Sequence, residues 1–145
     1  MNVTMLLADS AQVADGKLYI LGGGWSVCGP QPTPTAVAIK VSVDVPEFDL
    51  DHHWELFLED ADGNLVHFDT PEGPQSLEIR GDFTAVQPQG VPMGTSVDVP
   101  LAINLGPVPL PPGARFSWRF VIDGESLPGS IASFSVRPLD EVLAD

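Results

Sequence analysis

The fold class of this 145-residue chain is decided by the stretch AVAIKVSVDV, residues 36–45. Apolar and smaller or polar side chains alternate along it, which is the pattern of a half-buried β-strand, whereas helices repeat about every 3.6 residues. The apolar set is Val37, Ile39, Val41, Val43 and Val45, and the set between them is Ala36, Ala38, Lys40, Ser42 and Asp44. The stretch therefore predicts a strand with one face in a core and the other increasingly exposed to water.

The same alternation recurs along the rest of the chain. It appears in HHWELFLED, SVDVPLAINL and RFSWRFVID and, interrupted by Gly81, in SLEIRGDFTA. We expect Gly81 to mark a bulge or bend, and Pro100 to place its strand at a sheet edge or in a bulge, because proline cannot donate to a ladder. Shorter strands are expected at 2–8, 17–22, 65–68 and 130–136.

The turns agree with a sheet of antiparallel strands. Asp-Gly occurs at 15–16, 62–63 and 123–124, each time between alternating segments, and it is the strongest short signal for a tight hairpin. The 15 prolines fall mainly in connections. We therefore expect an all-β fold: a single antiparallel β-sandwich of eight or nine strands, immunoglobulin-like or C2-like, over residues 1–137, followed by a short tail at 138–145.

The charge balance excludes several partner classes. Twenty acidic residues against six basic ones give a net charge of −14, which repels nucleic acid and anionic lipid, and the bases form no stripe in the sequence. We expect no nucleic-acid binding, and no membrane insertion because no apolar run is long enough for a membrane helix. The N-terminus has no basic segment of the kind that begins a signal peptide, which indicates a cytoplasmic location.

The glycine triplet in DGKLYILGGGWSVCG, residues 15–29, raises the question of a phosphate loop. Such a loop needs a lysine after the glycines and a helix that supplies amide donors, and CGPQPTPT cannot begin a helix. We interpret the triplet as a place where the strand bends or another backbone comes close. The candidate hinge or interface residues are Gly22, Gly23, Gly24 and Trp25.

Two side chains in the same stretch could act as nucleophiles. Ser26 lies one position away from a Gly-x-Ser-x-Gly elbow, because Cys28 stands where the last glycine is needed. Cys28 has no base beside it in the sequence, and a lone cysteine is more often a small buried hydrophobe. A hydrolase using Ser26 or Cys28 remains a remote alternative, and we expect no catalytic residue.

An acidic connection follows the opening stretch. Carboxylate oxygens suit calcium, and sandwich domains can hold that ion between loops, so a calcium site is an alternative to solvated acidic loops. The four candidate ligands are Asp44, Glu47, Asp49 and Asp51. DADGN at 60–64 does not fit an EF-hand, because Leu65 and Pro71 stand where glycine and glutamate are required. No other cofactor is expected.

The N-terminal stretch LLADSAQVADGKLYILGGGWS, residues 6–26, also resembles a known family. The match rests on Ala8-Asp9, on the Asp-Gly-Lys turn at 15–17 and on Leu-Gly-Gly-Gly-Trp at 21–25, and PTP, TPEG, NLGPVPLPPG and the closing tryptophan hairpin extend it. The family is a bacterial, largely actinobacterial domain of unknown function. The resemblance covers nearly the whole chain and implies no activity, ligand or site residue.

The absence of a catalytic constellation and the edge strands of a sandwich favour one function. We expect a non-catalytic interaction or assembly module that binds protein, possibly itself as a homo-oligomer. The alternative is a ligand-binding sandwich that holds calcium, a glycan or a small apolar molecule in loops near Trp25 or Trp54.

Overall fold

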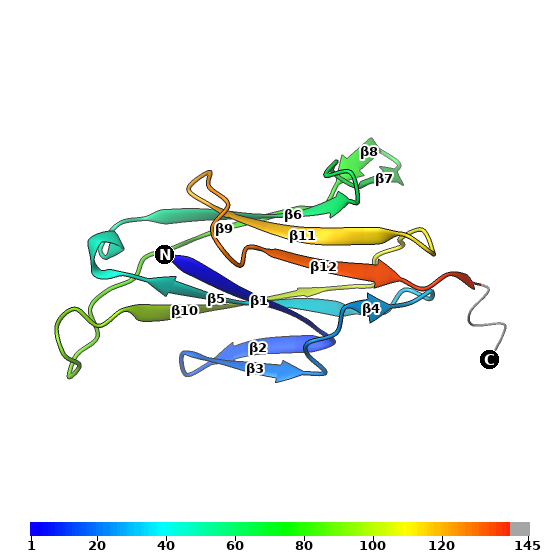
Figure 1. Ribbon diagram of the computed structural model, residues 1–145. Coiled ribbons are helices and arrows are strands. Elements are labelled where there is room, and N and C mark those ends of the chain that lie inside the picture. Colours follow the sequence, from blue (N-terminus) through cyan, green and yellow to red (C-terminus); the bar gives the residue numbers. More distant parts are fainter. Residues whose placement is uncertain (140–145) are drawn as a thin grey trace.

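The computed structural model describes residues 1–139 and confirms an all-β fold (Figure 1). Its elements in chain order are β1 (Asn2–Ala8), β2 (Ser10–Ala14), β3 (Lys17–Leu21), β4 (Val27–Cys28), β5 (Thr35–Val43), the 3-10 turn η1 (Val45–Glu47), β6 (His52–Asp60), β7 (His67–Thr70), β8 (Gly73–Ser76), β9 (Glu78–Phe83), β10 (Val97–Leu105), β11 (Arg115–Ile122) and β12 (Ile131–Val136). Most of the expected tail, at 140–145, lies outside the described residues.

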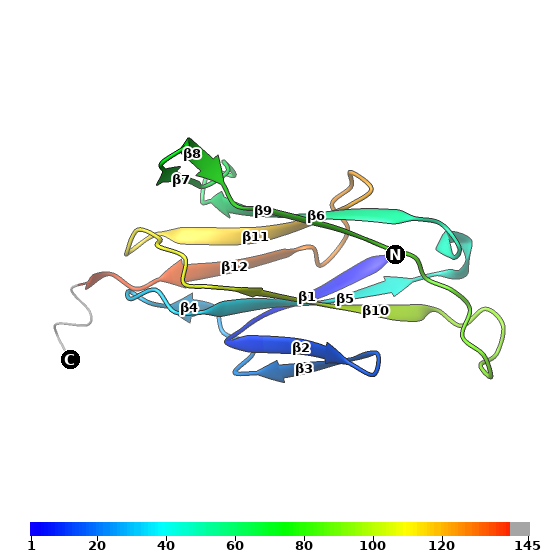
Figure 2. The same ribbon diagram turned by 180° about the vertical axis from the view of Figure 1, so that it is seen from behind.

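Two larger sheets face each other across the core (Figures 1 and 2). The smaller of the two, called the smaller sheet below, has the order β1-β5-β10. The larger sheet has the order β4-β12-β11-β6-β9. All of their pairings are antiparallel except that of β4 with β12. Most of the opening stretch lies in β5, at the centre of the three-stranded sheet, where Val37, Ile39, Val41 and Val43 line the core as expected. Val45 is an exception: it is 43% exposed and begins η1 before Pro46.

The expectation of one sandwich of eight or nine strands is not met, because the described residues form twelve strands in four sheets. The hairpins β2–β3 and β7–β8 pair only within themselves. The β2–β3 hairpin lies as a third layer over the outer face of the smaller sheet (Figure 2). Small side chains make room for it. These side chains are Ala8, Ala36, Ala38 and Ala102. Hence Ala36 and Ala38 are buried, although they alternate with the core positions.

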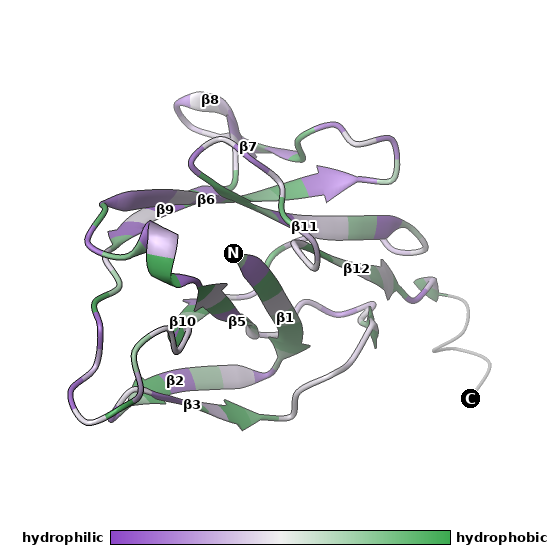
Figure 3. Ribbon diagram, turned by 60° about the vertical axis from the view of Figure 1, so that its left-hand side comes forward, coloured by the Kyte–Doolittle hydropathy of each residue, from purple (hydrophilic) through white to green (hydrophobic). Residues whose placement is uncertain are grey.

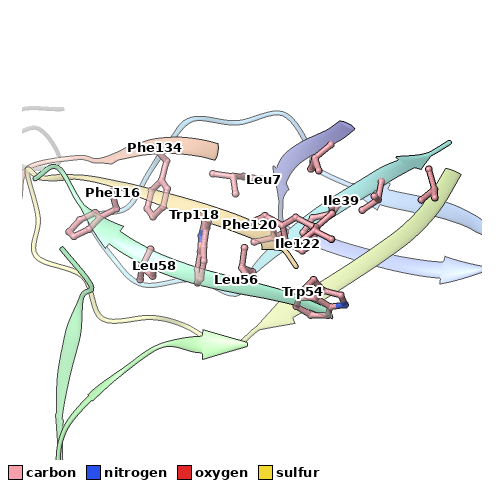
Figure 4. Close-up of a cluster of buried hydrophobic side chains, with 14 of the residues drawn as sticks. Leu7, Ile39, Trp54, Leu56, Leu58, Phe116, Trp118, Phe120, Ile122 and Phe134 are labelled. Atoms are coloured by element: carbon pink, nitrogen blue, oxygen red, sulfur yellow. The ribbon is translucent and has the colours of Figure 1, made fainter. Parts of the chain in front are cut away.

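The core is filled by aromatic and branched side chains from both larger sheets (Figure 4). Trp118, Phe120 and Leu56 come from the larger sheet and meet Ile39 of β5, and all four are almost completely buried. Trp54, which the alternative function places near ligand loops, belongs to this core, as the alternation of HHWELFLED indicates: it is 7% exposed on β6 and its ring lies 5.6 Å from that of Phe120.

Gly81 is not a bulge, because β6 and β9 pair without interruption past it. Gly81 lies opposite Trp54, and a Cβ there would lie 2.5 Å from the indole ring, so the residue leaves room for the ring. The expected edge position of the strand that holds Pro100 is confirmed, because β10 lies at the edge of the three-stranded sheet. The Asp-Gly pair at 15–16 forms the expected tight turn between β2 and β3, with positive φ at both residues.

A seam joins β1 to the connection that precedes β12. The N–H of Val3 donates to the carbonyl oxygen of Pro128 over 3.2 Å. Gly129 has a φ of +81°, and a Cβ on it would overlap the carbonyl oxygen of Val3. Glycine is required there by both its backbone conformation and the approach of a second backbone.

Candidate functional site

The β2–β3 hairpin is held to the smaller sheet by one side chain from a distant strand. Asn104 of β10 accepts a hydrogen bond from the N–H of Ala11 over 3.1 Å and donates one to the carbonyl oxygen of Ala11 over 2.7 Å. Both backbone groups of Ala11 therefore point away from β3. The amide of Asn104 occupies the hydrogen-bonding positions that a further strand would use, so it closes the outer edge of β2 at this point.

The outer edge of β3 has no such cover. Ala11 pairs with Ile20, and backbone groups of facing residues alternate in direction along an antiparallel ladder. Because Ala11 points away from β3, the N–H and carbonyl of Ile20, and those of Leu18 two residues earlier, point away from β2. Among the described residues no strand pairs with this edge.

The outward face of β3 is apolar beyond Lys17 at its start. Tyr19 is 53% exposed and Leu21 is 71% exposed (Figure 3 colours much of this strand hydrophobic). Exposed apolar side chains beside an unpaired edge are typical of a surface that takes up another strand. We define the β3 edge as residues 17–21 with their outward backbone groups, and it is the candidate site.

The glycine triplet follows this edge, and the chain bends at Gly22, while the role of the triplet as a hinge stays a prediction. Gly22 and Gly24 have positive φ values of 61° and 91°, and the N–H of Gly24 donates to the carbonyl oxygen of Leu7 over 2.8 Å. A Cβ on Gly22 would overlap the carboxylate of Asp9, and one on Gly23 would lie 2.6 Å from Ile20. The chain's own side chains thus lie against these two glycines, and a role of the triplet in an interface stays a prediction.

Trp25 turns into the molecule. Its ring packs edge-on against Phe134 at 6.0 Å, and its Nε1 is buried without a hydrogen-bond partner among the described residues. It lines a small cavity of about 40 Å³ that also borders Cys28 and Trp118. Trp25 therefore anchors the bend to the core and contributes little to the outer surface.

The candidate nucleophiles take part in strand pairing. The carbonyl oxygen of Ser26 accepts from the N–H of Ser135 over 2.9 Å, and Cys28 lies in β4 opposite Val136. Burial raises the pKa of the Cys28 thiol, and the charge of Arg137 only partly offsets this. A reactive cysteine needs a lowered pKa, so this environment is the opposite of an activated one.

The four candidate calcium ligands are not gathered into one site. The carboxylate of Asp44 lies 3.6 Å from the N-terminal amine, and that of Asp51 accepts a hydrogen bond from Thr84 over 2.8 Å. Asp49 and Glu47 contribute backbone groups to their own contacts, with Ala85 and His52. Within residues 1–139 no group of three or more His, Cys, Asp or Glu side chains could hold a metal ion. Calcium binding stays a prediction for which these residues supply no cluster.

Beside that acidic connection lies a buried histidine that the sequence did not single out. His52 is 2% exposed, its Nδ1 lies 2.8 Å from a carboxylate oxygen of Asp123, and its Nε2 lies 2.8 Å from the carbonyl oxygen of Glu47. Burial alone would lower the pKa of His52, but the two acceptors outweigh burial and raise it. A carboxylate and a carbonyl can only accept, so this pair of neighbours favours the protonated ring, in which both nitrogens donate.

Sequence reasoning predicted the strand at 17–22, which the structure shows as β3, but placed the candidate interface on the glycines after it and not on the strand's own edge. The available signal was the low charge of SAQVADGKLYIL, residues 10–21. Its only charged residues are Asp15 and Lys17, and it ends on Tyr-Ile-Leu. In a chain with a net charge of −14, a neutral hairpin with an apolar end is unusual. No pattern in the sequence indicated which edge of the hairpin Asn104 would cover.

The comparisons with known proteins give one match. The model of a family described as a family of unknown function, DUF6941, matches residues 3–134. No curated protein and no solved structure matches the chain. The expected membership of a family of unknown function is confirmed, while its N-terminal signature and its actinobacterial range stay predictions. No helix in residues 1–139 is both long enough and apolar enough to cross a membrane.

Proposed function

Because the chain belongs to the DUF6941 family, whose function is unknown, we propose a function from the molecule's own geometry: it is a non-catalytic assembly module in which two copies pair through the β3 edge. The observation that carries this proposal is the contrast between the two sides of the hairpin. Asn104 covers the edge of β2 at Ala11, whereas no strand in residues 1–139 pairs with the outward groups of Leu18 and Ile20, beside the exposed Tyr19 and Leu21.

The outward groups define the register of the proposed pairing. Two copies related by a two-fold axis pair antiparallel, with Leu18 of each copy opposite Ile20 of the other, so that both residues exchange their N–H···O bonds. Tyr19 then lies opposite Tyr19 of the second copy, on the outward face. Aromatic pairs at directly opposed positions stabilise antiparallel strands.

The distribution of charge favours this surface for self-association. Two molecules that each carry −14 repel each other, and the repulsion is smallest where both surfaces are neutral. Residues 10–21 carry one acidic and one basic side chain, Asp15 and Lys17. The β2–β3 hairpin is also an outer layer of the molecule (Figure 1). A second copy can therefore reach it without contact between the larger sheets of one copy and those of the other.

Other features support a non-catalytic role within this proposal. Burial raises the pKa of the Cys28 thiol, whereas an activated nucleophile needs a lowered one. We assign the two larger sheets to the expected immunoglobulin-like or C2-like sandwich, which serves as the scaffold for the hairpin. The cytoplasmic location expected from the sequence is part of the same proposal.

Sedimentation velocity of the full chain, from about 1 to about 100 µM, tests the proposal. The wild type should form a dimer as concentration rises. Tyr19→Glu should remain monomeric, because the pairing would place two carboxylates directly opposite each other. Met93→Glu is the matched control, since it adds the same charge at a residue that is 95% exposed in the turn before β10, and it should dimerise like the wild type.

Circular dichroism first checks that both variants are folded. A wild type that stays monomeric throughout the range would refute the proposal. It would fail equally if Tyr19→Glu dimerised as well as Met93→Glu, because the interface would then lie elsewhere.

A further inference from the structure

A second surface lies at the opposite side of the molecule from the β2–β3 hairpin, beside the β7–β8 hairpin (Figure 1). It is an open groove of about 760 Å³. Its walls come from the turn that ends β6, from residues 65–69 and from the proline-rich connection between β10 and β11. We call it the β7 groove. It shares no residue with the β3 edge.

The proline-rich connection separates this groove from the core. Val108 and Leu110 pack against the core, while Pro109 and Pro111 line the groove. Proline is stiff and lacks an N–H, so this wall is firm and offers few donors of its own. The groove is therefore a preformed feature of the fold, with an apolar wall on one side.

The opposite wall is the free edge of β7. Residues 65–69 all line the groove, although side chains of successive strand residues point to opposite faces, and no residue of β8 lines it. A strand whose consecutive residues all border one groove presents its edge to that groove. Asp69 lies opposite Pro74, which has no N–H to donate, so in the alternating ladder the backbone groups of Asp69 and His67 point away from β8.

The chemistry of the lining selects a type of occupant. Phe68, Val66 and the buried Phe116 form the apolar part. Asp62 and Asp69 are exposed at the border, and no described residue forms an ion pair with either carboxylate. Arg115 is the one arginine or lysine in the lining.

From these features we propose that the β7 groove binds an extended segment of a partner protein, in which arginine or lysine side chains alternate with apolar ones. The segment pairs with the outward backbone groups of His67 and Asp69, so that it adds a strand to the β7–β8 hairpin. Its apolar side chains lie on Phe68 and Phe116. Its basic side chains reach Asp62 and Asp69, and the charge of −14 on the whole chain steers such a segment to the surface.

Isothermal titration with the peptide acetyl-(Arg-Val)4-amide tests this proposal. The wild type should bind it, while acetyl-(Glu-Val)4-amide should not bind. The double variant Asp62→Asn with Asp69→Asn should lose about tenfold in affinity, because two charge-assisted contacts are removed without a change of shape. The matched control is Asp15→Asn with Glu125→Gln, which removes the same charge away from the groove and should bind within about twofold of the wild type.

Two further measurements keep the result specific to strand addition. Amide chemical shifts should move at 65–69 when the peptide binds, and arginine amide at equal concentration should not displace the peptide. Absence of binding to the wild type would overturn the proposal. Equal loss in the two double variants, or full displacement by arginine amide, would also overturn it, because the surface would then attract any cation. Repeating the titration on Tyr19→Glu separates this result from the assembly proposed above.

Discussion

Gly129→Ala should destabilise the protein far more than the same change at Gly124. The two glycines have nearly identical backbone conformations, with φ of +81° and +80°. A Cβ at Gly129 would overlap the carbonyl oxygen of Val3, whereas a Cβ at Gly124 would meet nothing within 4 Å. Comparison of the two variants therefore isolates the close approach of the two backbones at the seam.

The expected magnitudes follow from separate costs. A left-handed conformation costs a residue with a Cβ about 1–2 kcal/mol, and the smaller entropy of the unfolded alanine chain returns roughly 0.4–1 kcal/mol. Gly124→Ala should thus lower the free energy of unfolding by about 1 kcal/mol. At Gly129 the overlap adds about 2 kcal/mol, because a backbone atom cannot move aside by rotating, as a side chain could. The total for Gly129→Ala is about 3 kcal/mol.

Urea unfolding followed by tryptophan fluorescence measures both values. The slope of the transition should stay constant, so that the shift of the midpoint reports stability alone. Equal destabilisation by the two substitutions would refute the reasoning. It would mean that β1 moves away from Gly129 at no cost and that the seam does not hold the two larger sheets together.

Two other predictions concern single contacts. The raised pKa of His52 means that its link to Asp123 contributes stability fully below the ordinary histidine pKa of 6.5 and loses it as pH rises through the folded-state pKa. The free energy of unfolding of the wild type should therefore exceed that of Asp123→Asn most near pH 6 and converge toward it in alkaline buffer; parallel curves in urea titrations would contradict this. Asn104→Ala should cost about 1–3 kcal/mol, because the backbone groups of Ala11 lose both partners. Hydrogen exchange should then quicken at the Ala11 amide but not in β11, and uniform quickening would argue against a local role.

Much of the fold was accessible from alternation alone, because burial on one face of a sheet imposes a period of two on the sequence. The stretch at 36–45 became β5, and Pro100 marked an edge. The third layer was not accessible in this way. Ala36 and Ala38 have the small side chains of a half-exposed face, and only the position of the β2–β3 hairpin reveals that they form its floor.

The candidate site was predicted less well, for a physical reason. The tight Asp-Gly turn fixes which backbone groups of the hairpin point outward, but a neighbour decides which of its edges is covered. That neighbour is Asn104, 93 residues from Ala11 in the sequence. Gly81 gives the same lesson, since its lack of a side chain reflects the indole of Trp54 on the next strand. Local patterns identify strands and turns, whereas contacts between distant segments decide which edges stay open.

The hydrogen bonds between Asn104 and β2 limit the number of copies that the proposed assembly can contain. A hairpin with two open edges could bind one copy on each side, and each new copy would offer a further edge, so that growth would continue into a filament. Because Asn104 covers the edge of β2 at Ala11, the proposed pairing of β3 with β3 uses the more open edge of the β2–β3 hairpin in each copy. The assembly then ends at two copies, and a single amide on β10 distinguishes a closed pair from an endless sheet.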